Sequence, residues 1–244
     1  MGPMAKIGFI ARVLFAGWKF WTGPSQIRAD VPCPLSYRTH VVGQADSGDR
    51  LPLLIVLHGG GAHEEDLDGV FEDWQVSVRM GRGYTWSRGE GTTQREAYEA
   101  DRQMFREVAD SLAVAAAEVA NRYPTEGKAM VFGFSAGASM AWYLGAHHPD
   151  RFDAIFVVAG DLDSDLLEDF LPASRPPFFA YHGKRDGVVS ISSGHKTARA
   201  IEKLAGRVVF EEFDGGHTVP PSARADVEVQ IEQLRVGSLA MGRP

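Results

Sequence analysis

The sequence predicts an α/β fold with a mainly parallel central sheet and helices on both of its faces. From about residue 35 onward, short segments rich in β-branched and aromatic residues alternate with longer segments of helical spacing. Alternation of this kind is typical of a parallel sheet, because each crossover between parallel strands needs a long connection. Continuous apolar runs such as LLIVL and AIFVV suit central strands that are covered on both sides.

Seven segments are expected to be strands, because each is short, apolar and bounded by Gly, Pro or polar turns. In chain order they are LSYRTHVV, LPLLIVLHG, VSVRM, KAMVFGF, FDAIFVVAG, PPFFAYHG and RVVFEEFDG. Helical spacing is found between the later ones, at roughly residues 95–121, 136–147, 192–204 and 222–235. The first of these helices ends just before Pro124, as a helix should.

Composition and charge exclude several classes of protein. The chain has 244 residues, of which 44% are hydrophobic, and it shows no repeat or interdomain linker, so we expect one domain over residues 35–244. The net charge is −7 and basic residues are scattered, which argues against a nucleic-acid partner. Cys33 is the single cysteine, so an intrachain disulfide and a cysteine-based zinc site are excluded. We expect a cytoplasmic protein, with a periplasmic or secreted location left open by the apolar N-terminus.

Residues 1–34 form an N-terminal apolar extension whose role stays open. Its segment KIGFIARVLFAGWKFW is interrupted by Arg12 and Lys19, unlike the unbroken apolar core of a signal peptide. The segment is too short and too charged to span a bilayer, so we expect no integral membrane association. It is interpreted as a helix or strand packed on the domain, or else as a partial cover of the site, a homodimer contact or a membrane-surface element.

A candidate nucleophile lies in the turn between a predicted strand and a predicted helix. Ser135 is the centre of GFSAG, at the strand end where loops of a parallel sheet converge. The turn must be sharp enough to push the serine above the sheet, and side chains at Gly133 and Gly137 would collide where strand and helix nearly touch. The helix that begins after Ser135 also directs free N–H groups toward the same point.

The glycine-rich loop VLHGGGAH, residues 56–63, also follows a predicted strand. Acyl transfer passes through a tetrahedral oxyanion that needs preorganised N–H donors, which such a loop can present without side chains in the way. We expect one donor from Gly60, with Gly61 as the alternative, and the other from Ala136. A phosphate-binding loop is disfavoured because the Lys and Ser/Thr of that motif are missing.

Two further loops supply a candidate acid and a candidate base. Asp186 lies just beyond a predicted strand in YHGKRDGVV, and it is preferred as the acid over Asp161 and Asp163. His217 follows the last predicted strand in FDGGHTVPP, where an imidazole can reach a serine above the sheet. Serine, acid and histidine then occur in the chain order known for nucleophile-elbow hydrolases.

Three further histidines are expected in structural roles. His147 and His148 are placed at a predicted helix C-terminus, where they can satisfy free carbonyl groups. His58 is expected to organise its glycine loop rather than to transfer protons.

With these motifs, the chain resembles the α/β-hydrolase superfamily, and within it the bacterial phospholipase/carboxylesterase family of small serine esterases. The resemblance covers roughly residues 35–235 through HGGG, GFSAG, HGKRD and GGHTVPP, together with GRGYTWSRG at 81–89. It implies an α/β-hydrolase fold, a triad of Ser135, Asp186 and His217, and an oxyanion hole formed by Gly60 and Ala136. By the same resemblance Trp86 is part of the substrate wall.

The function expected from these residues is that of a serine carboxylesterase that hydrolyses a small-molecule ester through an acyl-enzyme, without a metal or organic cofactor. Connections between strands leave little chain for a cap, so Trp86 and Phe134 are expected to line an open cleft for short acyl or aromatic groups. Alternatives are a feruloyl esterase or a polyhydroxyalkanoate depolymerase, a serine peptidase or acyltransferase, and a non-catalytic ligand-binding protein of the same fold.

Overall fold

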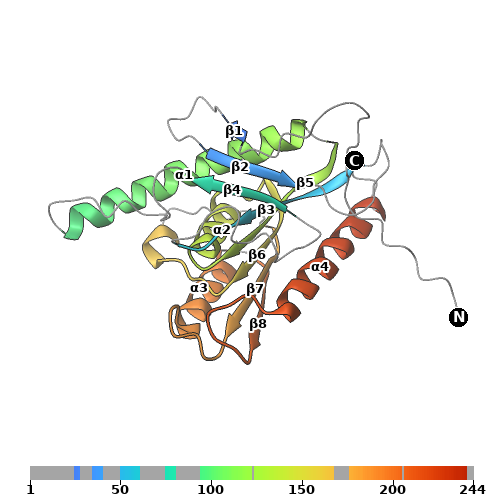
Figure 1. Cartoon of the computed structure of the whole chain (residues 1–244). Helices are drawn as coiled ribbons and strands as arrows, with labels where there is room; N and C mark the ends of the chain where they lie inside the picture. Colours follow the sequence, from blue (N-terminus) through green and yellow to red (C-terminus); the bar gives the residue numbers. More distant parts are fainter. Residues whose placement is uncertain are drawn as a thin grey trace, which may run out of the picture.

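The strands that the structure describes join in one sheet. The structure, a computed structural model, describes residues 25–27, 35–40, 50–60, 75–80, 94–122, 124–167, 176–204 and 206–240. Within these ranges the sheet has eight strands in the order β1-β2-β4-β3-β5-β6-β7-β8 (Figure 1). The strands are β1 Ser25–Ile27, β2 Leu35–His40, β3 Leu51–Leu57, β4 Gln75–Met80, β5 Thr125–Phe134, β6 Phe152–Val158, β7 Phe178–Gly183 and β8 Val208–Phe213. The helices are α1 Gln94–Arg122, α2 Ala136–His147, the 3₁₀ helix η1 Ser164–Leu167, α3 Ile191–Lys203 and α4 Pro221–Ala240.

The sheet is mainly parallel, as the sequence predicts. The β1–β2 and β2–β4 pairs are antiparallel, and every pair from β4 through β3, β5, β6 and β7 to β8 is parallel. From β3 the chain passes to β4 on one side, and it then returns through α1 to β5 on the other side of β3. Loops leaving β3 and β5 therefore diverge at a topological switch point, where α/β sheets open a crevice.

Helices cover both faces of the sheet, which confirms the predicted layers. Alternate residues of β3 point to opposite sides, so that Leu53, Ile55 and Leu57 pack in the cluster containing α1, α2 and α3, whereas Leu54 and Val56 pack in the cluster containing α4. Figure 1 shows α4 separated from α2 and α3 by the sheet. Continuous burial of the last five residues of β3 and of β6 matches their unbroken apolar runs.

All seven predicted strands are present, and the four predicted helices agree with the structure to within one residue, except that α4 continues to Ala240. A three-residue strand from the N-terminal extension, β1, is added at the sheet edge beside β2. The remainder of residues 1–34 lies outside the described residues. Among the helices that the structure describes, none combines the length and the apolar character that crossing a bilayer requires.

Candidate active site

Ser135 occupies a strained turn between β5 and α2. Its φ of 56° and ψ of −120° lie in a region that non-glycine residues rarely adopt, and strain of this kind is concentrated at functional sites. The Ser135 N–H donates to the carbonyl of Val158 at the end of β6, at 3.0 Å, which ties the turn to the next strand. The Ser135 side chain does not cap α2, so its hydroxyl is available for another partner.

The two glycines of the turn are required by close backbone approach, as the sequence predicts. A Cβ built on Gly133 would lie 2.2 Å from the carbonyl oxygen of Gly137. A Cβ built on Gly137 would lie 2.2 Å from the carbonyl oxygen of Leu57 on β3. Real Cβ atoms do not approach backbone oxygens this closely, so both positions exclude a side chain.

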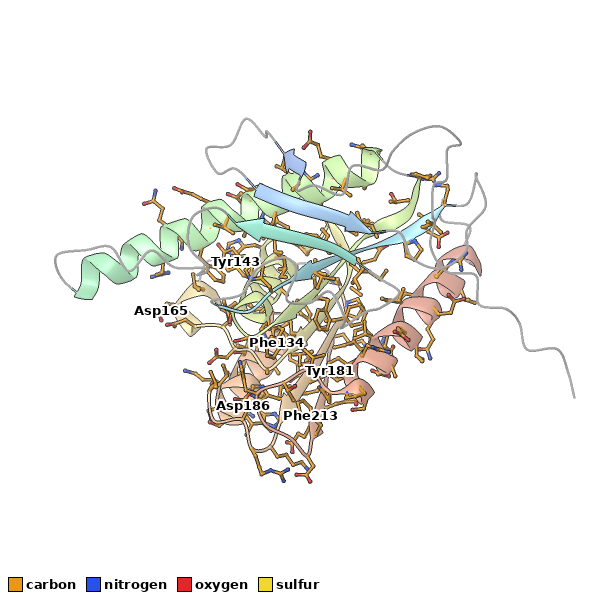
Figure 2. The ribbon with its side chains drawn as sticks, in the orientation of Figure 1. Phe134, Tyr143, Asp165, Tyr181, Asp186 and Phe213 are labelled. Atoms are coloured by element: carbon orange, nitrogen blue, oxygen red, sulfur yellow. The ribbon has the colours of Figure 1, made fainter. Side chains whose placement is uncertain are left out.

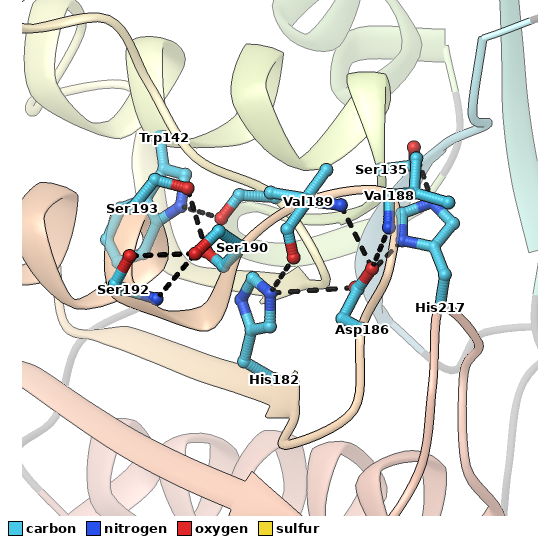
Figure 3. Close-up of polar contacts among 11 residues, drawn as sticks. Ser135, Trp142, His182, Asp186, Val188, Val189, Ser190, Ser192, Ser193 and His217 are labelled. Carbon is cyan, nitrogen blue, oxygen red and sulfur yellow. Dashed lines mark hydrogen bonds and ion pairs between the residues drawn. The ribbon is translucent and has the colours of Figure 1, made fainter.

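His217 connects the serine to a carboxylate. Its Nε2 lies 2.9 Å from Ser135 Oγ, and its Nδ1 lies 2.8 Å from Asp186 Oδ2 (Figure 3). An ionised carboxylate only accepts hydrogen bonds, so the Nδ1–H donates to Asp186 and the neutral ring leaves Nε2 free to accept from the serine hydroxyl. The ring is also packed against Phe134, with the ring centres 5.0 Å apart. This arrangement can remove a proton from Ser135.

Asp186 lies in the loop after β7, and its side chain is fully buried. Its Oδ1 accepts hydrogen bonds from the backbone N–H groups of Val188, at 2.8 Å, and Val189, at 2.9 Å. Burial alone raises the pKa of this carboxyl, but the hydrogen bonds from His217, Val189 and Val188 together lower its pKa below the usual value. The carboxylate is therefore held in its charged form.

The loop carrying Asp186 and the loop carrying His217 are bound to each other. The backbone N–H of Lys184 donates to Phe213, and that of Arg185 donates to Gly215, each at 2.9 Å. The side chains of Arg185 and Asp214 form an ion pair across the same two loops. Both loops are thus positioned as one unit at the carboxyl ends of β7 and β8.

The glycine loop after β3 lies directly beside Ser135. A Cβ on Gly59 would be 3.3 Å from Ser135 Cβ, and one on Gly60 would be 3.7 Å from Ala136 Cβ. His58 Nδ1 lies 2.8 Å from the Gly59 carbonyl, to which it donates, in agreement with the expected organising role of this histidine. The Gly60 N–H belongs to the same trans peptide and points the opposite way, so this hydrogen bond also fixes its direction.

Other residues singled out from the sequence have different environments. Asp163 is exposed, and its Oδ1 accepts from the backbone N–H of Asp165 at 3.1 Å, at the start of η1. His148 pairs with Asp110 of α1. Phe134 is the last residue of β5, and Asp186 lies in the loop after β7; both are labelled in Figure 2. Trp86 and Gly61 lie outside the described residues.

Two neighbours of Asp186 were not predicted from the sequence. One is the pair of backbone donors to Asp186, Val188 and Val189, although the side chain of an aspartate in a turn often accepts from a backbone N–H two residues further on. His182 was also missed, although HGKRD contains it and it lies at a strand end. Among the described residues no group of three or more His, Cys, Asp or Glu side chains could hold a metal ion.

Known proteins with a similar sequence include one that is an esterase by name. A model of the Phospholipase/Carboxylesterase family matches residues 75–234. The chain is 30% identical over 172 residues to a protein of Nocardia uniformis subsp. tsuyamanensis named "Putative esterase NocK". This match covers 62% of the chain and 45% of the relative, so the chain spans less than half of that relative's length.

Solved structures share the fold at low sequence identity. Esterase PE8 has a TM-score of 0.63 at 22% identity, over 78% of this chain and 95% of its own. A carboxylesterase from Bacillus cereus has a TM-score of 0.60 at 16% identity, over 84% and 96%. Zea mays acyl-protein thioesterase 2 has a TM-score of 0.58 at 20% identity, over 81% and 98%. With its fold, its motifs and the match over residues 75–234, the chain belongs to the phospholipase/carboxylesterase family of α/β-hydrolases.

Proposed function

We propose that this protein is a serine carboxylesterase that hydrolyses esters of short acyl or aromatic groups through a covalent acyl-enzyme. The observation that carries the proposal is the continuous set of contacts from Ser135 Oγ through His217 to the buried carboxylate of Asp186, at 2.9 and 2.8 Å. A nucleophile, a base and a group that orients the base are the parts that nucleophilic acyl transfer requires.

In the acylation step, His217 Nε2 takes the proton of Ser135 as Oγ attacks the ester carbonyl carbon. The developing negative charge is stabilised by the N–H groups of Gly60, in the loop after β3, and of Ala136, the first residue of α2. The positive charge that forms on His217 is stabilised by Asp186. His217 then returns the proton to the leaving alcohol, which departs as the carbonyl forms again.

Deacylation repeats these steps with water in place of the serine hydroxyl. His217 removes a proton from water as its oxygen attacks the acyl carbon, and it returns that proton to Ser135 Oγ when the acid leaves. A thioester would be attacked at the same carbon with a thiol as the leaving group. The likeness to an acyl-protein thioesterase makes thioesters a second substrate class to compare.

The proposed preference for small acyl groups rests on how few residues are available to form a cap over the site. In the connection between β6 and β7, the described residues 162–167 pack into the helical layer, where Leu162, Leu166 and Leu167 are buried in the core cluster. Arg102 of α1 holds this segment by donating to the carbonyl of Asp165 at 2.8 Å. Such a segment contributes to the core rather than to a mobile lid.

The test combines covalent labelling with kinetics. A fluorophosphonate probe should label the wild-type protein at Ser135, and Ser135→Ala should lose both the label and about 10⁴-fold or more of the hydrolysis of p-nitrophenyl acetate. Alanine fits this turn, because it adds no atom that serine lacks. Labelling of another residue, or a Ser135→Ala protein with near wild-type turnover, would refute the assignment of the nucleophile.

A series of p-nitrophenyl esters tests the substrate class. Each methylene that finds an apolar wall should add about 0.8 kcal/mol of binding, or about fourfold in kcat/KM, until the wall ends. We expect this gain to stop at about six acyl carbons, where the shallow cleft expected from the sequence would end. A steady increase up to palmitate would indicate a deep acyl channel instead, and higher kcat/KM for matched thioesters would indicate a thioesterase.

A further inference from the structure

His182 is a buried histidine at the carboxyl end of β7 that takes no part in the acyl-transfer steps. Its relative exposure is 1%, and its ring lies between α3 and the loop of Asp186. A Cβ on Gly194 of α3 would be 2.6 Å from His182 Nδ1, so only glycine leaves room for the ring. The ring also lies nearly parallel to that of Phe210, with the ring centres 6.3 Å apart. Contacts from α3 and β8 therefore restrict the position of the His182 ring.

One nitrogen of this ring contacts both ends of the acid loop. His182 Nε2 lies 2.9 Å from the carbonyl oxygen of Val189 and 3.5 Å from Asp186 Oδ2 (Figure 3). A carbonyl oxygen can only accept, so Nε2 must carry a hydrogen. That hydrogen donates to Val189, and the same N–H group presents its positive end to the buried carboxylate.

A closed ring of contacts results. The backbone N–H of Val189 donates to Asp186 Oδ1 at 2.9 Å, while the carbonyl of Val189 accepts from His182. His182 in turn stands 3.5 Å from the other carboxylate oxygen, Oδ2, which accepts from His217. Both the N–H and the carbonyl of Val189 are therefore hydrogen-bonded, and both oxygens of Asp186 have at least one N–H group beside them.

We propose that His182 is a positioning residue for Asp186, which keeps the acid loop closed and the carboxylate rotated so that Oδ2 faces His217. This inference rests on the proposed function. The Nδ1–H of His217 donates to Oδ2 in both charge states of the ring, but the strength of this hydrogen bond changes each time the ring gains or loses a proton. His182 is a constant partner that belongs to the same strand end as the acid. With it, the acid keeps its orientation while the base gains and loses a proton.

Two substitutions of equal length separate the hydrogen-bond donor from the packing. In His182→Gln the amide nitrogen is as many bonds from Cα as Nε2 is in histidine, so an N–H donor is retained. The methionine of His182→Met has a side chain as long as that of glutamine, four heavy atoms counted from Cβ, but it has no N–H group. We expect kcat for p-nitrophenyl acetate to fall about tenfold in His182→Met, the effect of one hydrogen bond at a charged site. KM should change little, and His182→Gln should recover most of kcat.

His195→Met is the matched control. His195 stacks on the same Phe210, at 4.1 Å between ring centres, and pairs with Glu212 at 2.8 Å on the protein surface. Its substitution should leave kcat unchanged. Circular dichroism and thermal melting of all variants report whether each folds.

Magnetic resonance of the imidazole nitrogens gives a second readout, and its first part needs only the wild-type protein. In the wild-type protein, His182 should have its hydrogen on Nε2. The far-downfield resonance of the His217 Nδ1–H should shift or broaden in His182→Met and be retained in His182→Gln. Wild-type kcat in a folded His182→Met, equal losses in the Gln and Met variants, or an unprotonated Nε2 in the wild type would each overturn the proposal.

These outcomes are distinguishable from a failure of the proposed function. If Ser135 were not the nucleophile, the fluorophosphonate label and the Ser135→Ala variant would reveal it directly. The nitrogen resonances would then still decide whether His182 holds Asp186. If Ser135 is labelled and required, but His182→Met is as active as the wild type, only the role of His182 fails.

Discussion

Asp186→Asn is the substitution whose consequence the structure defines most closely. Asparagine replaces one carboxylate oxygen by an NH₂ group, and the two oxygens of Asp186 have different partners. Oδ1 accepts from the N–H groups of Val188 and Val189, whereas Oδ2 accepts only from His217 among the donors within 3 Å. Placing NH₂ at Oδ1 would oppose two donors, so the amide should turn its NH₂ toward His217.

The base is then held in the wrong tautomer. An NH₂ group next to Nδ1 favours a ring with its hydrogen on Nε2, and that nitrogen can no longer accept the proton of Ser135. The negative charge that stabilises the imidazolium is lost as well. We expect kcat to fall by about 10⁴-fold, equivalent to about 5.5 kcal/mol of transition-state stabilisation. The two backbone hydrogen bonds at Oδ1 remain, so the protein should fold.

Initial rates on p-nitrophenyl acetate and thermal melting measure the two effects separately. Asp163→Asn is the matched control. In the wild type the N–H of Asp165 donates to Asp163 Oδ1 at 3.1 Å, and the amide oxygen of asparagine can accept the same hydrogen bond. The control should hydrolyse the substrate like the wild type. If Asp186→Asn retained more than about a hundredth of wild-type kcat, against an expected loss of about 10⁴-fold, or if Asp163→Asn were the impaired variant, the assignment of the acid would be wrong.

Three further predictions concern pH and stability. The hydrogen bonds to Asp186 outweigh its burial and lower its pKa, so the stability that this carboxylate contributes should be full above the pKa of an ordinary aspartate and should be lost as pH falls through the lowered pKa. Asp186 should then stay charged across the pH range of the activity assay, so the acid limb of kcat/KM should follow one ionisation. A limb with a slope of two would contradict this. Gly137→Ala should fail to fold or melt far below the wild type, because its Cβ would lie 2.2 Å from the carbonyl oxygen of Leu57; a wild-type melting temperature would show that β3 and α2 can separate. Tyr181→Phe removes the hydrogen bond to Asp226 of α4, so the free energy of unfolding from urea titration should fall by about 1–3 kcal/mol with kcat unchanged, and a loss of kcat at wild-type stability would instead connect this pair to the site.

Much of the fold could be predicted because its elements leave local signals. The run LLIVL indicated a strand buried on both faces, and β3 has that environment. The glycines around Ser135 were predicted from the sharpness of the turn, and their close backbone contacts agree. The three predicted triad residues follow different strands, and a parallel sheet brings such strand ends together, which is why their proximity could be expected before any distance was known.

What could not be predicted depends on contacts across the sheet. The position of β4 between β2 and β3 is set by pairing between distant segments, which no local pattern records. β1 has three residues, too few for a period of two to be recognised. The alternation along β7 assigns His182 to a face, but it gives neither the stacking on Phe210 nor the contact with Asp186. These contacts depend on how α3 and β8, which follow β7 in the sequence, pack against it.

The contacts between the loops that carry Asp186 and His217 have a consequence for recombination between related genes. These two residues are 31 positions apart, in one consecutive stretch that runs from β7 through α3 and β8 to His217, whereas Ser135 is 82 positions from His217. Because the contacts between the two loops lie inside that stretch, a single genetic exchange with a boundary between α2 and β7 would transfer the acid, the base and their relative geometry together. The serine would be left with the recipient. A chimera of two related sequences should therefore keep its proton-transfer geometry when divided there, and it should lose that geometry when divided within α3.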